Sequence, residues 1–269
     1  MKKIFIAIAI FLGVVGCKTN PFTGQRTLNF YPNSQVFPTA FAQYDAFLEE
    51  NKVVTGTADA QMIDKVGKRI AAASERWLTA NGYAGYLKDY KWEYNLVKDE
   101  TVNAWCMPGG KIVFYTGILP ICKGETGVAV VMGHEVAHAL ADHGAQRMSA
   151  GTLQQLGAVA GNVVIQDQST LNIFNQAYGV GTQYGAMLPF SRSHETEADK
   201  IGLQIMAIAG YNPYEAAELW KRMKANSGGQ AQPEFMSTHP SNDTRINNLT
   251  VWAPEAEAEA RKFGVTSFQ

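Results

Sequence analysis

Two histidines stand four residues apart, at His134 and His138, and Glu135 directly follows the first. Residues i and i+4 of an α-helix share a face, so both imidazoles can approach one metal ion. Glu135 then lies about 100° around the helix, where its carboxylate reaches a metal-bound water without being a ligand. Catalytic zinc takes three protein ligands and lowers the pKa of its water to about 7. The spacing predicts that Glu135 accepts a proton from that water and passes it to a leaving amine.

The third ligand of this predicted site has to come from another part of the chain. A metzincin motif would need Gly and His where this sequence has Ala141 and Gly144, and His143 is one position out of register. Glu195 and Asp199 are the best candidates, because an i, i+4 pair shares one helical face. Glu195 would bind the metal, and Asp199 would accept a hydrogen bond from a ligand imidazole. The alternative is a solvated acidic helix start, favoured by the helix dipole.

Two neighbours of this pair are assigned to other roles. Glu197 points away from the face that carries Glu195, so we expect it at the surface. His194 lies one step around the helix from Glu195. We expect it to be a cap or a surface residue and not a ligand.

Apolar periodicity predicts the elements that must position these residues. Residues 151–190 are rich in Gly, Ala and Gln and give mixed helix and loop signals. We expect a mostly helical α+β fold with a small antiparallel sheet, in which the helix that carries His134 simply continues past His138. Helices are expected over 41–50, 58–80, 124–148, 193–209 and 213–223, and strands over 92–97, 101–106 and 111–116.

The N-terminus has the pattern of an export signal. Lys2 and Lys3 precede an apolar run over residues 4–15, which is too short for a comfortable membrane span and suits a signal-peptide core. The run ends in Val-Val-Gly before Cys17, as in the lipobox of bacterial lipoproteins, whose Cys is acylated. We therefore expect a signal peptide over 1–16, a lipid anchor at Cys17 and a tether over 17–40. The alternative is an ordinary signal peptide with a chance Cys.

The length and net charge of the chain limit the classes of protein to which it can belong. The chain has 269 residues and a net charge of −1, so it can bury one sizeable core and has no broad basic surface for nucleic acid. Its Glu-Ala-rich end, over 253–269, is expected to be a solvated helical tail. Cys106 and Cys122 either form a disulfide in an oxidising compartment or remain two buried thiols.

Four segments, in this order, resemble one family of zinc metallopeptidases, the one that includes HtpX, BepA, LoiP and the CAAX prenyl proteases. The likeness is to their periplasmic lipoprotein branch and covers residues 40–250. The set of segments is far more specific than the first motif alone. The segments are Asn103–Gly117, His134–His138 with Asp142-His143, Ser191-Arg192 before Glu195–Asp199, and Ser237–Pro240 followed by Arg245.

The resemblance implies a gluzincin-type domain over 41–252 that holds one Zn²⁺ through His134, His138 and Glu195. It also implies that His239 approaches the metal and stabilises the oxyanion, and that Arg245 lies nearby and assists the same transition state. Charged donors suit a developing negative charge. In some family members the corresponding loop is thought to cover the zinc in a resting state. Without the resemblance, His239 would be a loop histidine with no catalytic part.

The strand over 111–116 is expected to form the edge of the substrate cleft, with Ile112, Val113, Phe114 and Tyr115 as its binding residues. An edge strand has unpaired N–H and C=O groups to which an extended peptide can add. Trp105 and Cys106 stand where the family would have Phe-like and Ala-like residues, which is expected to alter the pocket. The transmembrane helices of HtpX and the prenyl proteases have no counterpart here, which argues against prenylated substrates.

Together these features predict zinc-dependent cleavage of misfolded or unassembled cell-envelope proteins, by an enzyme anchored through Cys17 at the periplasmic face of the outer membrane. The expected partners are unfolded protein substrates and the membrane, with the oligomeric state left open. One alternative is a chaperone-like outer-membrane assembly factor whose zinc site is latent. Another is a lipoprotein that zinc only stabilises, although a structural site has no need of Glu135.

Overall fold

The computed structural model describes residues 16–226, 234–240 and 243–269, and the predicted signal-peptide core lies outside these ranges. The chain divides into two compact units. Among the described residues, the first contains 16–36 and 142–195, and the second contains 37–141, 196–226, 234–240 and 243–269. The segment 142–195, which was expected inside one domain over 41–252, therefore groups with the N-terminal residues.

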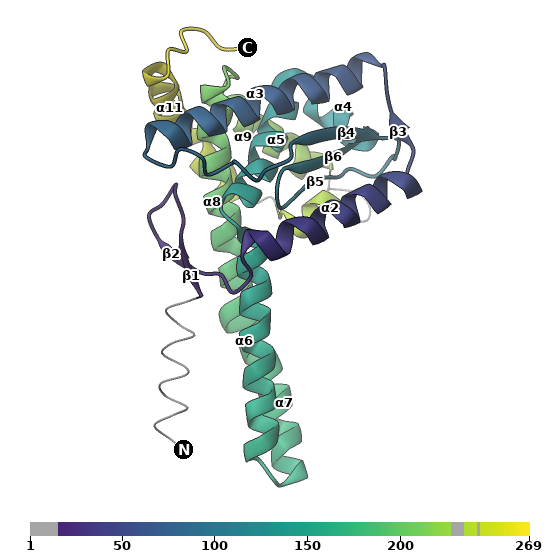
Figure 1. Cartoon of the computed structure of the whole chain (residues 1–269), viewed down its shortest axis with the longest axis vertical. Coiled ribbons are helices and arrows are strands. Elements are labelled where there is room, and N and C mark those ends of the chain that lie inside the picture. The colour runs from purple at the N-terminus through teal and green to yellow at the C-terminus, as the bar shows by residue number, and fades with distance from the viewer. Residues whose placement is uncertain (1–15, 227–233, 241–242) are drawn as a thin grey trace. The chain divides into compact units, whose positions relative to one another are not determined.

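The second unit is built around a four-stranded sheet (Figure 1). Its strands lie in the order β3-β4-β6-β5, and β4 and β6 run parallel whereas the other two pairs are antiparallel. The expectation of a purely antiparallel sheet was therefore wrong. The strands are β3 (Val53–Val54), β4 (Glu93–Val97), β5 (Ala104–Met107) and β6 (Lys111–Tyr115).

The prediction that Ile112–Tyr115 forms the edge of the cleft was also wrong. These residues belong to β6, which is paired on both sides, by β4 and by β5. A tight turn through Gly109 and Gly110, both at positive φ, folds β5 back along β6. The outer strand on that side of the sheet is β5, and within the described residues its far side pairs with no other strand.

Helices cover both faces of this sheet. α2 (Asn33–Glu50) packs Tyr44 against Val97 and Val113 on one face, where the Tyr44 hydroxyl donates to the carbonyl of Ile112 at 3.2 Å. α3 (Ala58–Ala80) lies on the other face, where Gly67 leaves room for the ring of Tyr94. Successive side chains of a strand point to opposite faces, which explains why both faces are apolar.

The motif helix, α5 (Glu125–Leu140), runs through the core and is buried from Gly127 to its end. It ends sooner than predicted, because the chain turns at Asp142, which has a left-handed φ of 56°. The hydroxyls of Tyr86 and Tyr90 donate to the carbonyls of Leu140 and Ala139, at 2.9 and 3.1 Å. Tyrosine side chains thus satisfy carbonyls that a continuing helix would have bonded.

A second buried helix crosses α5 at very close range. This helix is α8 (Leu188–Ile208), and it meets α5 at Gly133 and Gly202. A Cβ on Gly202 would lie 2.7 Å from the Gly133 carbonyl carbon, and a Cβ on Gly133 would lie 2.8 Å from the Gly202 carbonyl oxygen. Only glycine at both positions allows the two backbones this approach.

The remaining elements of the second unit are one 3₁₀ turn and four further helices among the described residues. α11 continues well into the segment that was expected to be a solvated tail, and it buries Ala253, Ala256 and Ala260. The elements are a 3₁₀ turn (Thr116–Ile118), α4 (Leu119–Cys122), α9 (Glu215–Asn226), α10 (Glu234–Thr238) and α11 (Asp243–Lys262).

The first unit contains a short β-ribbon and a helical hairpin. Residues 17–40, expected to be a tether, include β1 (Cys17–Thr19), β2 (Arg26–Leu28) and the start of α2. The hairpin consists of α6 (His143–Val164) and α7 (Gln168–Thr182), followed by a π-helical turn (Gln183–Met187). Among the described residues, no helix combines the length and the apolar character needed to cross a membrane. The predicted mostly helical α+β class is confirmed.

The crossing of α5 and α8 can be tested with alanine. Gly202→Ala should lower the free energy of unfolding by about 1–3 kcal/mol, because its methyl group meets the backbone of α5. Gly179→Ala is the matched control. Gly179 lies in α7, where an added Cβ would meet no other part of the protein within 4 Å, so alanine should stabilise the helix by about 0.5–1 kcal/mol. Urea unfolding measures both. Equal effects of the two substitutions would contradict the close crossing.

Candidate metal centre

Three polar side chains of α5 meet inside the core. His134, Glu135 and His138 are only 2%, 4% and 5% exposed. The Nε2 atoms of His134 and His138 lie 3.1 Å apart, and the rings meet edge to face. Both histidines therefore turn the same ring nitrogen toward one point, as the i, i+4 spacing predicts.

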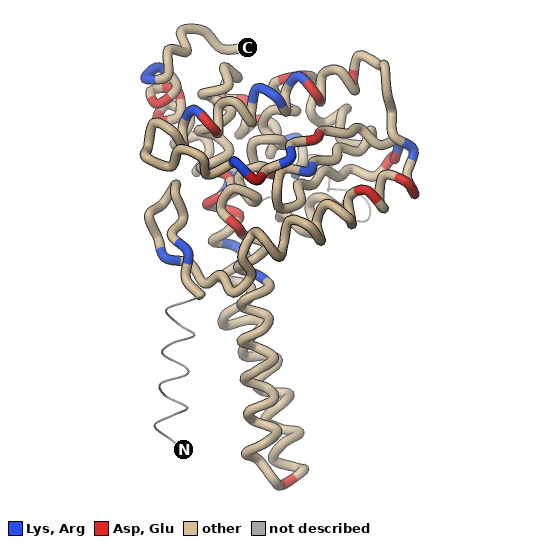
Figure 2. The backbone as a smooth tube through the Cα atoms, in the orientation of Figure 1, with Lys and Arg blue, Asp and Glu red and all other residues tan. Residues whose placement is uncertain are grey.

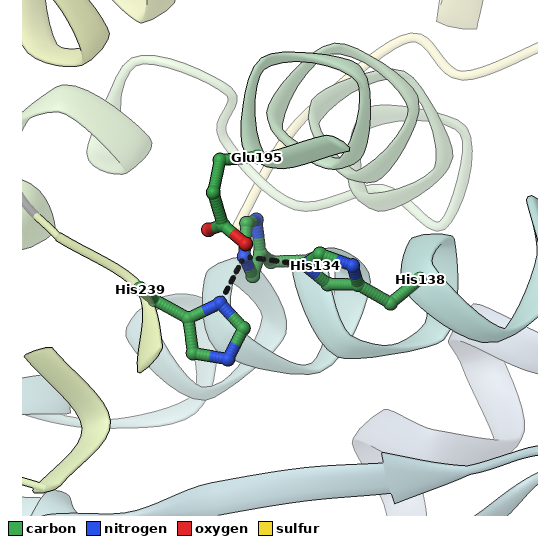
Figure 3. Close-up of side chains that lie close together, drawn as sticks. All are labelled: His134, His138, Glu195 and His239. Atoms are coloured by element: carbon green, nitrogen blue, oxygen red, sulfur yellow. Dashed lines mark hydrogen bonds between the residues drawn. The ribbon is translucent and has the colours of Figure 1, made fainter. Parts of the chain in front are cut away.

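Glu195 joins the two histidines from α8. The first unit ends at Glu195, and α8 continues without a break into the second unit. His239 follows α10 and points toward the same place (Figure 3). One ligand atom from each of the four side chains lies within 4.8 Å of all the others.

This set of donors fits zinc. Three imidazole nitrogens and one carboxylate oxygen are the ligands that zinc takes in proteins, and bond lengths near 2.0–2.1 Å in a tetrahedron put ligand atoms about 3.3 Å apart. The observed separations are close to this value: 3.1 Å between the Nε2 atoms of His134 and His138, and 3.2 Å from His134 Nε2 to His239 Nδ1. His134, His138 and Glu195 would hold the ion, and His239 stands at the fourth position.

Asp199 lies behind the first histidine. Its Oδ1 is 3.0 Å from His134 Nδ1, the nitrogen that faces away from the other ligands. A carboxylate in this place fixes the orientation of the ring and makes the opposite nitrogen a better metal ligand. The structure thus brings Asp199 to the position predicted for it, one helical turn beyond Glu195.

Arg245 is also near the site, but it does not point at the place where a substrate carbonyl would react. Its Nε and Nη2 donate to the two oxygens of Asp199, at 2.7 and 2.6 Å, and its Nη1 donates to the carbonyl of Pro240. Burial raises the pKa of Asp199, and the charge and hydrogen bonds of Arg245 outweigh burial and lower it. The predicted oxyanion role of Arg245 is therefore corrected to a positioning role through Asp199.

Aromatic side chains that the sequence did not single out complete the site. The guanidinium of Arg245 lies 3.8 Å from the ring centre of Trp220, whose ring also meets His134 at 5.7 Å. Phe235 packs on Trp220 and on His239. In the sequence, Trp220 is one more apolar position of an amphipathic helix, so nothing there separates it from an ordinary core residue.

His239 contacts both the ligand set and the predicted base. Its Nδ1 faces His134, and its Nε2 lies 3.4 Å from Glu135 Oε1. The short helix before it is tied to the segment preceding β5, because the N–H of Phe235 donates to the carbonyl of Val102 at 3.1 Å. His239 is thus held at the position that a catalytic water would need.

Several predicted residues lie elsewhere. His194 is buried and not at the surface: it stacks on His143 at 4.0 Å, and its Nε2 lies 3.1 Å from Gln146 Oε1. Burial lowers its pKa to about 3, so the ring is neutral at pH 7. Cys106 and Cys122 are free thiols. Burial, and secondarily the charge of Glu135, raises the pKa of Cys106, which keeps that thiol protonated.

Comparison with known proteins agrees with this geometry. The family described as peptidase family M48 matches residues 61–253. The mitochondrial metalloendopeptidase OMA1 of Schizosaccharomyces pombe is 38% identical over 198 residues, which are 73% of this chain and 54% of that protein. Human OMA1 is 27% identical over 89% of this chain and 46% of its own length. The β-barrel assembly-enhancing protease of Escherichia coli K12 is 27% identical over 56% of this chain and 32% of its own length. The chain spans about half the length of the OMA1 relatives.

The contact between Asp199 and His134 predicts the effect of Asp199→Asn. Zinc affinity should fall about 10–100-fold, because the imidazole loses its anionic partner. The free energy of unfolding should also fall by about 3–5 kcal/mol, since Arg245 stays buried without its counter-charge. Competition with a zinc-binding dye and urea unfolding measure the two effects.

The control for Asp199→Asn is Asp89→Asn, at an exposed position, which should change neither quantity. Arg245→Met added to Asp199→Asn should lower zinc affinity no further, because Arg245 acts through Asp199. A further large loss of zinc affinity in the double variant would mean that Arg245 also acts independently of Asp199.

Proposed function

This chain belongs to peptidase family M48, and we propose that it is a zinc-dependent endopeptidase that hydrolyses misfolded or unassembled proteins of the cell envelope. The observation that carries the proposal is the buried Glu135 beside a convergent set of zinc-type ligands. A site that only stabilised the fold would have no use for this carboxylate, because structural zinc takes four protein ligands and no base.

The residues of the site divide the chemistry between them. Zinc, when bound, would polarise the scissile carbonyl and lower the pKa of the attacking water to about 7. Glu135 accepts the proton of that water on a carboxylate oxygen and delivers it to the nitrogen of the leaving amine, which balances the hydrolysis. Asp199 keeps the Nδ1 proton on His134, so that Nε2 remains the ligand atom.

His239 has two arrangements in this proposal. Among the ligands, as in Figure 3, it takes the position of the catalytic water and holds the enzyme at rest. When it moves away from His134, its imidazole can donate to the carbonyl oxygen as negative charge develops there. Because the loop has to move before cleavage, substrate binding and activation would be linked.

Substrate is bound along β5 as an added strand. Tyr115 N–H donates to the carbonyl of Asn103, so the alternation of an antiparallel ladder makes Trp105 and Val113 the next hydrogen-bonded pair. The N–H and C=O groups of Ala104 and Cys106 consequently point away from β6. Ala104 is buried and its N–H already donates to Asn103 Oδ1 at 2.9 Å, so the N–H offered to substrate is that of Cys106. Main-chain pairing at Cys106 selects for extended chain and only weakly for sequence, which suits unfolded proteins.

The cellular place of this activity rests on the N-terminus. Cys17 follows a signal-type run and a lipobox-like Val-Val-Gly, which supports a lipid anchor in the envelope of a diderm bacterium. The E. coli relative is named for β-barrel assembly, whereas the OMA1 relatives are named as mitochondrial. We propose the periplasmic face of the outer membrane, with unfolded envelope proteins as substrates.

A second candidate function is a chaperone-like assembly factor with a latent zinc site. The position of His239 among the ligands is the observation that favours it, since His239 then stands at the fourth ligand position, which a catalytic site keeps for water. The two functions differ in whether Glu135 is needed. An assembly factor would still complement a deletion strain when it carries Glu135→Gln.

Glu135→Gln should retain zinc and lose cleavage of casein by about 10²–10⁴-fold, because glutamine cannot accept the proton. The measurement is casein digestion with and without a chelator, together with the zinc content of the purified protein. Glu255→Gln, which changes a carboxylate on α11, is the control and should cleave normally. Undiminished cleavage by Glu135→Gln would rule out the proposed mechanism.

Cys106→Pro tests the added strand. Proline removes the outward N–H of Cys106 without removing a hydrogen bond to β6, so kcat/KM for an unfolded substrate should fall about tenfold while zinc content stays unchanged. Cys106→Ala retains the N–H and serves as the matched control, with activity close to that of the unaltered chain. Equal losses in both variants would mean that the thiol, and not the backbone, binds substrate.

A further inference from the structure

The helical hairpin of the first unit almost lacks charge. Between Arg147 and Arg192 the sequence contains one ionisable residue that is charged at pH 7, Asp167 in the turn between α6 and α7. Figure 2 shows both helices without a charged residue along most of their length and with an acidic residue at the tip. Water-exposed surfaces usually carry about 25–35% charged residues, so this hairpin does not have the surface of a water-exposed element.

The interface between the two helices combines glycines, two aromatic rings and polar side chains. Gly157 and Gly161 leave room for the rings of Tyr178 and Phe174, which a Cβ at either glycine would strike. Polar side chains bond across the same interface: Gln154 Nε2 donates to Thr182 Oγ1 at 2.7 Å, and the Tyr178 hydroxyl donates to the Gln154 carbonyl at 3.1 Å. Close approach at small residues, with polar groups bonded between helices, is typical of helix pairs in lipid.

Other large apolar side chains lie on the outside. On α6, Leu156, Val159 and Val163 occupy the face turned away from Gly157 and Gly161, at i, i+3 and i+7 spacing, and α7 adds others on its own outer face. A hairpin made for water has polar and charged side chains on its outer faces instead. The outer apolar surface is formed by Leu156 (58% exposed), Val159 (58%), Val163 (73%), Ile173 (69%), Val180 (56%) and Tyr184 (69%).

We propose that the α6–α7 hairpin inserts its outer apolar surface among the acyl chains of a lipid bilayer. The outer face of α6 and the outer face of α7 point in opposite directions, so a protein docked on one side would leave the other in water. Lipid covers both. The helices satisfy their own backbone groups, and Gln154, Tyr178 and Thr182 form hydrogen bonds between them, as suits the hydrocarbon region. Neither helix has to cross the bilayer.

The ends of the hairpin agree with this environment. Asp167 accepts hydrogen bonds from the Ser169 hydroxyl and the Thr170 N–H, at 2.6 and 2.7 Å, so the exposed turn has a polar group suited to a headgroup layer. At the other end, the β-ribbon that carries Cys17 belongs to the same unit. Lys18 pairs with Asp142 at 2.5 Å, and Phe30 N–H donates to Ser149 Oγ at 2.9 Å.

An acyl group on Cys17, which is part of the proposed function, would therefore bring the root of the hairpin to the membrane. Insertion itself does not depend on the acyl group, because it comes from the outer apolar surface. The two sources of membrane binding can be separated by removing the thiol. Cys17→Ser leaves the hairpin intact and abolishes acylation.

The test is flotation of the full chain carrying Cys17→Ser with neutral phosphatidylcholine vesicles, at about 0.5 M salt to screen charge. We expect the protein to float with the vesicles. Adding Leu156→Glu, Val163→Glu and Ile173→Glu should reduce vesicle binding at least about tenfold, because carboxylates are excluded from hydrocarbon. Val251→Glu is the matched control: Val251 is 66% exposed on α11, outside the hairpin, and its substitution should change nothing.

Three results would overturn the proposal. The first is that the Cys17→Ser protein stays in the unbound fraction, and the second is that the triple variant floats as well as the control. The third is that the triple substitution has one effect only, the dissociation of an oligomer seen by light scattering without vesicles. The last would assign the surface to a second copy of the chain. If the triple variant loses its helical circular dichroism, the corresponding asparagine variant replaces it, with an expected loss of at least about threefold. Palmitate labelling of the unaltered chain and of Cys17→Ser tests the anchor separately.

Discussion

The metal centre depends on the distance between two helix backbones at Gly133 and Gly202. Side chains at either position would push α5 and α8 apart, because each glycine already faces the main chain of the other helix. His134 directly follows the first glycine, and Asp199 stands three residues before the second. A shift of an ångström at this crossing would separate the carboxylates of α8 from the imidazoles of α5, and zinc bond lengths tolerate only a few tenths of an ångström.

Near this crossing, the polar and charged side chains of the site form a chain of contacts that leads from the ligand histidines to Trp220. His134 and His138 are buried, and Asp199 gives His134 an anionic partner. That carboxylate is itself buried, and Arg245 compensates its charge through two short hydrogen bonds. Trp220 covers the guanidinium with its ring face. An unpaired charge at either place would cost several kcal/mol, so Asp199 and Arg245 have to be regarded as one unit.

Helix α8 connects two parts with opposite surface chemistry. Its last part supplies Asp199 and Gly202 to a core in which polar groups are buried and bonded. The hairpin that precedes it packs glycines, two aromatic rings and polar side chains between its helices and exposes further large apolar residues on its outside. The same physical rule explains both arrangements: polar groups pair with one another wherever water is excluded, and the apolar side chains face the medium that solvates them.

The sequence by itself determined the chemistry of the site, because that chemistry rests on local helical spacing. The i, i+4 pairs His134/His138 and Glu195/Asp199 identify two metal-facing helix faces without any knowledge of the fold.

Only the tertiary structure decided which side chains meet across larger separations. Arg245 bonds Asp199 from 46 residues away, which no periodicity reports. Period-2 alternation is the same in an edge strand and in a central strand. The sequence pattern therefore could not tell that β5, and not β6, is the outer strand of the sheet. At the break near Asp142, Tyr86 and Tyr90 donate to the last carbonyls of α5, and the exposure of apolar side chains on the hairpin depends on which helix faces pair.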